Sequence, residues 1–288
     1  MTLPDHDRSR PTRRSVDAAA SVLRDGSEER VELISLLDEE LAVLLRETGV
    51  DAAPVWMPWA DENTDGLDAA VPTVRRILMR RRQLVPELLA AELEERDLEL
   101  ADDQLVADPT TAGVLVLRRS AVAVTTAIRT VALAEGPREL RCWFYHQSNG
   151  VTLEERVTAE GLHDFAVQPT AAMAERLAQL VDPDGVASED SEAREVTAGT
   201  PPEEWGPGIA DRTRHLTQAV MTTPQAAMAR SASFHATDDA VHVAAPDLSV
   251  EGPLESVPLQ VAQVSPDSLR DVLAALIEFD EPSRPGAL

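Results

Sequence analysis

The sequence predicts an α+β protein built from two related β-β-β-α halves with small antiparallel sheets, preceded by a helical N-terminal region. The main observation is a strand-like segment that runs into Val-x-Pro and then directly into a helix with periodic apolar residues. This pattern occurs twice, at 165–181 and 261–277. With a one-residue gap, Leu-Ala-Gln-Leu-Val of the first copy aligns with Leu-Ala-Ala-Leu-Ile of the second. The duplication indicates a pseudo-symmetric scaffold.

The N-terminal region is expected to be mostly helical. Residues 1–14 are charged, have no apolar run and are expected to form a tail. A helix is predicted over 27–47, because a serine can cap its start and apolar residues at i, i+3, i+4 spacing line one face. A proline-bounded extended segment at 54–59 follows. Two more helices are predicted over 67–82 and 86–96, the second with proline in its first turn.

The segment 109–134 is ambiguous. Asp108-Pro109 is typical of a helix start, and apolar residues keep a helical spacing, yet Val and Thr are frequent and favour strands. We favour a helix for most of this segment, with a strand as the alternative.

The clearest predicted strand is 140–147. Its alternation places Trp143 and Tyr145 on one face. The opposite face carries Leu140, Cys142 and Phe144. Asn149-Gly150 is typical of a type I′ hairpin turn. The elements expected after the turn are strands at 151–154 and 162–167 and a helix at 170–181.

The second half is expected to repeat the first. The stretch 182–208 is acidic and rich in Pro and Gly, which predicts a linker. The predicted elements beyond it are a helix at 209–221, strands at 230–236, 240–244 and 257–264, and a helix at 267–279. The predicted hairpins of the two halves carry the pairs Tyr145-His146 and Phe234-His235. The expected domains are 15–181 and 209–279, with a tail at 280–288.

Composition narrows the function more than any motif does. The 288 residues carry a net charge of −25, which disfavours binding to nucleic acid or an anionic membrane. All 26 basic residues are arginine, so Schiff-base, Walker A and protein-kinase chemistry lack their lysine. With a single cysteine there is no internal disulfide. No apolar run reaches the ~18 residues of a membrane helix, so a cytoplasmic location is expected, with the chain a monomer or homodimer.

No constellation of residues predicts a cofactor or a metal. Cys142 and His146 share a strand face but lie about 13 Å apart at ~3.3 Å per residue, too far for one metal ion. The segment 61–66 matches the first half of a calcium loop, but the twelfth position is Pro72, so we expect a turn in which Asp65 caps the next helix, with calcium left open.

Two doublets, Glu154-Glu155 and His163-Asp164, raise the question of acid–base catalysis. Glu155 lies on the apolar side of its predicted strand, and His163 lies on the next strand. An enzyme using Glu155 and His163 is one alternative, and a buried carboxylate paired with an arginine explains the same pattern. Since nucleophile motifs are also absent, we expect that the chain is not an enzyme. A ligand-binding or sensor module remains a further alternative.

The chain has one basic cluster, in which Arg75, Arg76 and Arg80 precede two further arginines. A solvated helix face balanced by downstream glutamates explains it. The more specific hypothesis is that these arginines bind an acidic segment of a partner.

The chain resembles the EspG-type chaperones of ESX (type VII) secretion in two features. These are the duplicated tails at 165–181 and 261–277 and, within 50–58, a short helix that ends before a proline-bounded segment. The resemblance covers about half the chain in pattern. It implies a pseudo-two-fold α+β fold and the binding of a secreted helical protein partner through the sheet and adjoining loops. We therefore expect a protein-binding scaffold, with Trp143 and Tyr145 as anchors if helices cover only the opposite face.

Overall fold

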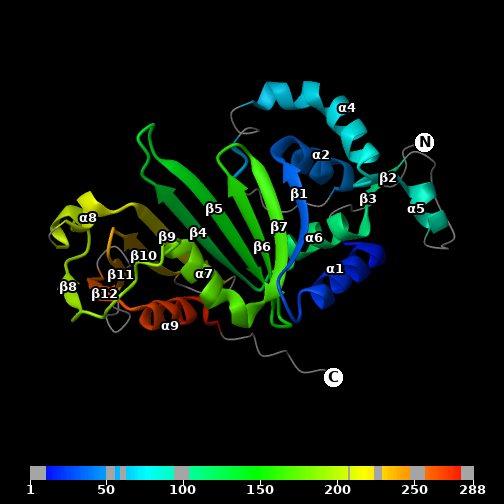
Figure 1. The fold of residues 1–288 in the computed structure, drawn as a ribbon. Coiled ribbons are helices and arrows are strands. Elements are labelled where there is room, and N and C mark those ends of the chain that lie inside the picture. The colour runs from blue at the N-terminus through cyan, green and yellow to red at the C-terminus, as the bar shows by residue number, and fades with distance from the viewer. Residues whose placement is uncertain are drawn as a thin grey trace. The chain divides into compact units, whose positions relative to one another are not determined.

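The computed structural model describes residues 11–49, 56–58, 63–93, 104–206, 208–223, 229–246 and 257–279 (Figure 1). The α+β class is confirmed: helices accompany antiparallel strands throughout the described chain. The chain forms two compact units. Unit 1 contains 1–121 and 149–169, and unit 2 contains 122–148 and 170–288. Both units contain segments of the domain expected at 15–181, because 122–148 and 170–181 belong to unit 2 and the rest belongs to unit 1. None of the described helices combines the length and the apolar character that crossing a bilayer requires.

Unit 1 contains a three-stranded antiparallel arrangement with β7 in the middle, between β1 and β6. A second, two-stranded sheet pairs β2 with β3. Helices α1 and α6 pack on each other at Gly113, where an added Cβ would lie 2.9 Å from the carbonyl oxygen of Ala18. The elements are α1 (Arg13–Asp25), β1 (Val31–Leu37), α2 (Asp38–Thr48), α4 (Thr64–Arg80), β2 (Leu84–Pro86), α5 (Glu87–Leu93), β3 (Leu105–Ala107), α6 (Pro109–Arg119), β6 (Val151–Thr158) and β7 (Leu162–Pro169).

The N-terminal prediction is partly wrong. The helix predicted over 27–47 is a strand, β1, followed by helix α2. The pairing of β1 with β7 shifts between Glu32 and Ile34, so a bulge interrupts the two-residue alternation. The apolar residues therefore take a spacing that mimics a helix. The end of the expected tail at 1–14 is also wrong, because Arg13 and Arg14 begin α1.

The predicted helices at 67–82 and 86–96 correspond to α4 and α5. The proline-bounded segment at 54–59 lies largely outside the described residues. In the ambiguous segment 109–134, Asp108 caps α6 by accepting hydrogen bonds from the backbone N–H groups of Thr110 and Thr111. The helix ends at Arg119, and the rest forms strand β4, so the preference for a helix is wrong for the second half.

Unit 2 arranges seven strands in the order β5-β4-β9-β10-β11-β12-β8, all antiparallel. Strand β4, from the expected first half, pairs directly with β9, from the expected second half, so the two halves do not have separate sheets. The elements are β4 (Ala123–Val131), β5 (Arg138–His146), a 3-10 turn (Thr170–Ala172), α7 (Met173–Val181), β8 (Arg194–Val196), a second 3-10 turn (Pro202–Glu204), α8 (Ile209–Arg212), β9 (His215–Thr222), β10 (Arg230–Ala236), β11 (Val241–Pro246), β12 (Leu259–Val264) and α9 (Pro266–Ile277).

Two segments of unit 2 differ from their predictions. The helix predicted over 209–221 is wrong, since only the single turn α8 forms before strand β9. The expected linker 182–208 contributes β8 to the sheet edge and places Trp205 in a small apolar cluster with Val196 and Ile209. It is therefore part of the folded unit over its described residues.

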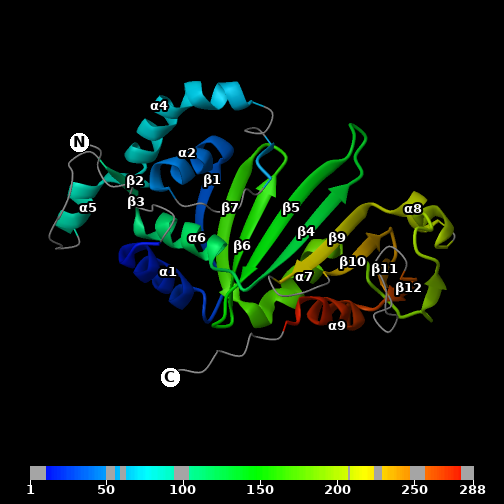
Figure 2. The ribbon, with the colours of Figure 1, turned by 180° about the vertical axis from the view of Figure 1, so that it is seen from behind.

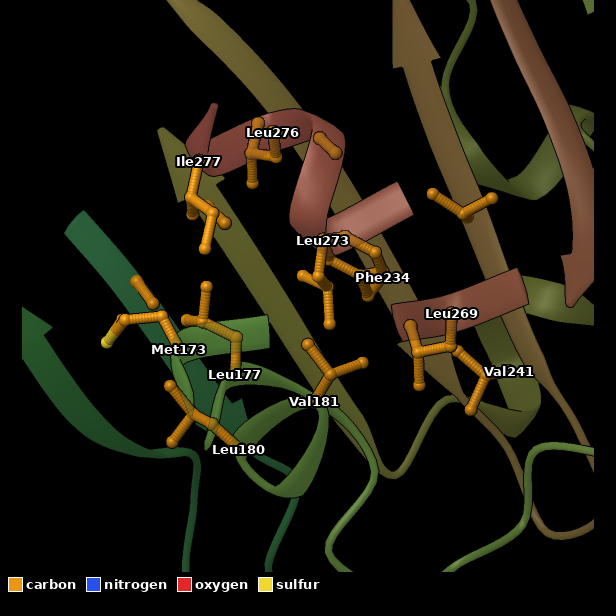
Figure 3. Packing of buried hydrophobic residues seen from close by; sticks show 14 of the residues in the cluster. Met173, Leu177, Leu180, Val181, Phe234, Val241, Leu269, Leu273, Leu276 and Ile277 are labelled. Atoms are coloured by element: carbon orange, nitrogen blue, oxygen red, sulfur yellow. The ribbon is translucent and has the colours of Figure 1, made fainter. Parts of the chain in front are cut away.

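The duplicated strand-to-helix pattern is confirmed in the order of elements. Val167-Gln168-Pro169 leads from β7 into a helical turn and α7, and Val264-Ser265-Pro266 leads from β12 into α9. The aligned apolar positions of both helices lie buried in one core cluster, which Figure 3 shows in close-up. These positions are Leu177, Leu180 and Val181 in α7 and Leu273, Leu276 and Ile277 in α9.

The two aromatic–histidine pairs do not occupy equivalent positions in their strands. Phe144 pairs with Thr125, and Phe234 pairs with Thr217, and all four side chains are buried. Phe144 therefore corresponds to Phe234, and the histidines 146 and 235 point to opposite faces of their strands.

Candidate functional site

The two faces of the sheet in unit 2 differ in what covers them. On one face, α7 and α9 cover Cys142, Phe144 and Phe234 and form the main core. Figure 2 shows β4, β9 and β10 from the other side, in front of α7. We call the part of this second face formed by β5, β4, β9 and β10 the outer face. Two cross-strand rows define it: Trp143, Thr126, Val220 and Ser231, and Arg141, Ile128, Gln218 and Ser233.

The outer face is neither core nor ordinary surface. Seven of its eight side chains are half-buried, and Gln218 is exposed. The only charged side chain in the two rows is Arg141, which donates to the carboxylate of Glu139 at 2.7 and 3.1 Å. In a chain with 27% charged residues, this strip of Thr, Val, Ile and Trp is depleted in charge. Charge depletion at the centre of a patch is the compositional mark of a protein interface.

The structure separates the two predicted aromatic anchors. Trp143 lies on the outer face and is half-buried, as the alternation of strand β5 predicts. Tyr145 lies on the same side of the strand but is only 6% exposed. The expectation that both aromatics are presented outward is therefore wrong for Tyr145, which is buried and cannot serve as a contact without rearrangement.

Sequence reasoning did not find most of the outer face. Strands β4 and β9 supply Thr126, Ile128 and Val220, and both segments were predicted to be helices. In β9, Thr217, Ala219 and Met221 are buried and alternate with more exposed neighbours, as in a strand with one buried face. The sequence hides this two-residue period, because Leu216 and Val220 on the other face are also apolar.

Unit 1 contains a buried cluster that joins the two residues of the acid–base hypothesis. The Nδ1 atom of His163 lies 2.8 Å from Oε1 of Glu155, and its Nε2 atom lies 2.7 Å from Oδ1 of Asp38. The Nε atom of Arg118 lies 3.0 Å from Oε2 of Glu155. We call these four residues the buried ion cluster. Two carboxylates, a guanidinium and a protonated imidazole balance its charge.

The pKa of His163 supports that protonation state. Burial lowers the pKa, but hydrogen bonds to Asp38 and Glu155 and the charges of both carboxylates outweigh burial, so the pKa of His163 is raised above 6.5. The cluster is the arrangement that a buried charge needs, with each charge paired. The alternative explanation of Glu155, a buried carboxylate paired with an arginine, is thus confirmed.

The same geometry bears on catalysis. Glu155 and His163 do meet at hydrogen-bond distance, which is one condition for the acid–base hypothesis. Both side chains are fully buried, however, and both ring nitrogens of His163 already face carboxylates. A surface depression of about 230 Å³ in the same unit is lined mainly by polar residues, among them Arg30, Arg156 and Asp164, and neither Glu155 nor His163 lines it.

The predicted arginine cluster lies on the exposed side of the last turns of α4. Arg75 forms an ion pair with Glu47, whereas Arg76 donates only to the hydroxyl of Thr73 among the described residues, at 3.3 Å. The side chain of Arg80 has no ion pair or hydrogen bond with another described residue.

The described residues give little support to the metal and calcium hypotheses. Within the described residues, no group of three or more His, Cys, Asp or Glu could hold a metal ion. Cys142 is buried, and His146 contacts the hydroxyl of Thr125 at 2.8 Å. The start of the possible calcium loop lies outside the described residues, and the N-cap of α4 is Asn63 rather than the predicted Asp65.

No protein-family model matches the chain, and no curated protein matches it. The chain is similar to the type VII secretion system chaperone EspG5 of Mycobacterium tuberculosis, solved in complex with the PE25–PPE41 dimer. The identity is 8% and the TM-score 0.48, over 86% of this chain and 98% of that chain. A likeness of this extent does not establish a family or a function for this chain.

Proposed function

We propose that the chain is a non-enzymatic protein-binding scaffold, a chaperone or adaptor, and that it holds an α-helical segment of its partner on the outer face. The observation that carries this proposal is the charge-poor strip formed by Trp143, Thr126, Ile128 and Val220. Helices α7 and α9 cover the opposite face of the same strands.

A helix is the occupant that the surface favours. Sheets bury their apolar faces by packing against helices or other sheets. The small side chain of Thr126 lies between Trp143 and Val220 in the first row, and Ser231 ends that row, which leaves room for the ridge of a helix. Trp143, at the end of that row, is the residue type most often found as an interface anchor.

We also propose that the partner is a secreted protein and that the chain is located in the cytoplasm. Both parts of this proposal are supported by the sequence pattern at 165–181 and 261–277 that resembles EspG-type chaperones. The absence of catalysis is likewise a proposal. It is supported by the missing lysine chemistry and by the full burial of Glu155 and His163.

The test is co-purification of the tagged full-length chain from its native host, followed by a binding titration with the purified, identified partner. Val220→Asp places a charge in the centre of the outer face, and Trp143→Ala removes the anchor. We expect Trp143→Ala to weaken binding about tenfold or more, since truncation of a hot spot costs about 2 kcal/mol. Val220→Asp should abolish binding.

The matched control is Leu133→Asp, which introduces the same charge at an exposed apolar residue of unit 2 outside the two rows. Circular dichroism and thermal unfolding establish that each variant folds. A folded Val220→Asp variant that retains the helical partner would contradict the proposal, as would equal losses in Val220→Asp and Leu133→Asp.

A further inference from the structure

Five arginines lie within eight residues at the end of α4, and they divide into two groups. Arg81 donates to the carboxylate of Glu40 at 2.6 Å and to the carbonyl of Ser35 at 3.0 Å, and Arg75 pairs with Glu47. These two fasten α4 to α2 and β1. The second group is Arg76, Arg80 and Arg82. All three are exposed, and none of them forms an ion pair with a carboxylate of the described residues.

Three uncompensated arginines within the seven residues 76–82 are unexpected in this chain. Acidic residues outnumber basic residues by 51 to 26, so a carboxylate partner is statistically easy to supply. Some exposed arginines find one, such as Arg212 with Asp239 and Arg214 with Asp238. Within the described residues Arg24 and Arg138 do not, but neither belongs to a group of unpaired arginines. Arg76 and Arg80 are four residues apart on one helix, which sets their Cβ atoms about 6 Å apart on the same face.

Arg82 adds an independent observation. It is the only non-glycine residue with a positive φ in the described chain, at 61°. Its N–H donates to the carbonyl of Met79, and that of Gln83 donates to the carbonyl of Leu78, which is a Schellman motif with Arg82 at the left-handed C′ position. Glycine is strongly favoured at this position. An arginine kept there at a cost in stability points to a role for its side chain.

Apolar residues flank the arginines. Ile77 is 42% exposed and Met79 is 39% exposed, although both are large apolar side chains. On the helix, Ile77 lies three residues before Arg80, and Met79 lies three residues after Arg76, so each apolar residue neighbours an arginine. The surface therefore combines two exposed apolar side chains with neighbouring guanidinium groups that can bind carboxylates bidentately.

We propose that Arg76, Ile77, Met79, Arg80 and Arg82 form a docking surface for an acidic amphipathic helix of a partner protein. Carboxylates at i, i+4 spacing on that helix match the spacing of Arg76 and Arg80, and an apolar residue between them contacts Ile77 and Met79. A protein fits better than nucleic acid. Charges more than ~8 Å apart are largely screened at physiological salt, so a short acidic segment meets the arginines locally. A duplex brings a charge about every 1.7 Å to a chain of net charge −25.

This surface lies in unit 1 and does not rest on the proposed function of the outer face. The probe is a fluorescein-labelled synthetic amphipathic helix with glutamates at i, i+4 spacing beside a leucine stripe. Its control peptide has glutamine at every glutamate position. Fluorescence anisotropy with the full-length chain measures binding at physiological ionic strength. We expect the acidic peptide to bind and the glutamine peptide to bind at least about tenfold more weakly, because the charge-assisted pairs are lost.

Three variants distinguish a role of the arginines in binding from a role in stability. Arg76→Gln with Arg80→Gln should weaken binding of the acidic peptide about tenfold or more. Arg24→Gln with Arg138→Gln removes the same charge from exposed positions elsewhere and should leave binding unchanged. Arg82→Gly should raise the urea midpoint of unfolding and weaken binding several-fold. If the arginine has only a structural role, Arg82→Gly changes stability without changing binding.

Several results would overturn the proposal. One is equal binding of the acidic and glutamine peptides, and another is an equal loss in the Arg24/Arg138 control. Displacement of the peptide by an oligonucleotide at lower concentration would assign the surface to nucleic acid. A dimer in sedimentation equilibrium that disappears in the Arg76/Arg80 variant would assign it to a second copy of the chain.

Discussion

At the scale of single residues, the buried ion cluster depends on a glycine that contributes no side chain. Gly161 has a φ of 77°, and its carbonyl accepts a hydrogen bond from the N–H of Asp38 at 3.0 Å. A Cβ at this position would lie 2.9 Å from the carboxylate of Asp38. The close approach of this turn to the carboxylate therefore requires glycine.

We predict that Gly161→Ala lowers the free energy of unfolding by about 2 kcal/mol or more, through backbone strain and displacement of Asp38 from His163. The matched control is Gly150→Ala, where φ is also 77° but nothing lies within 4 Å of an added Cβ. Urea unfolding of both variants measures the difference. Equal destabilisation would show that only the backbone conformation matters and that the contact with Asp38 does not.

The residue scale also shows what the sequence could predict of the candidate sites. The sequence could predict that Glu155 is buried and paired with some arginine, because Glu155 lies on the apolar side of a strand. Asp38 and Arg118 could not be identified as its neighbours, because they come from elements far apart in the chain. No local spacing predicts that α2 begins beside β7 or that α6 ends beside β6.

At the scale of elements, the core of unit 2 depends on equivalent leucines in α7 and α9. Leu177 and Leu273 are both fully buried in the same cluster and correspond in the repeat (Figure 3). We predict that Leu177→Ala and Leu273→Ala each lower the free energy of unfolding by about 2–5 kcal/mol, because each leaves a cavity that the surroundings fill only in part.

The double variant tests whether the two helices share one core. Since α7 and α9 pack together, the effects of the two substitutions should not add, with a coupling of about 0.5 kcal/mol or more. Chemical denaturation of the single and double variants gives this coupling. Strict additivity would mean that the two leucines lie in independent cores.

Elements were predictable where local signals agreed and were missed where pairing decided the conformation. The repeat tails were found because the proline and the apolar spacing indicate the same helix start. The structure adds a cap that the sequence analysis did not use, since Ser265 accepts a hydrogen bond from the N–H of Ser268. Strand β1 was missed because its bulge breaks the two-residue alternation. Strand β9 lies between two neighbours, β4 and β10, and its conformation is set by that pairing rather than by local propensity.

At the scale of the whole molecule, the two units contain histidines that respond to pH in opposite directions. In unit 1, the carboxylates around His163 raise its pKa above 6.5 despite its burial. In unit 2, burial lowers the pKa of His146 to about 4. Burial and the charge of His242 likewise lower the pKa of His235 to about 4.

The signs follow from proton linkage. His163 binds its proton more tightly when folded, so its contribution is complete below pH 6.5 and is lost as pH rises through the folded pKa. His146 and His235 are neutral in the fold, so their contributions are complete above pH 6.5 and are lost as pH falls to about 4. The loss for each of these two is on the order of 3 kcal/mol.

We therefore predict that acid weakens unit 2 before unit 1 and that alkaline pH weakens unit 1. Hydrogen exchange, corrected for the intrinsic effect of pH on exchange rates, should show β4 and β10 losing protection between pH 6.5 and 4. The strands β6 and β7 should lose protection as pH rises through the raised pKa of His163. His146→Gln should reduce the acid response of unit 2, and His163→Gln should reduce the alkaline response of unit 1. Parallel loss of protection in both units at both extremes would contradict this assignment, because a single cooperative transition would then govern the chain.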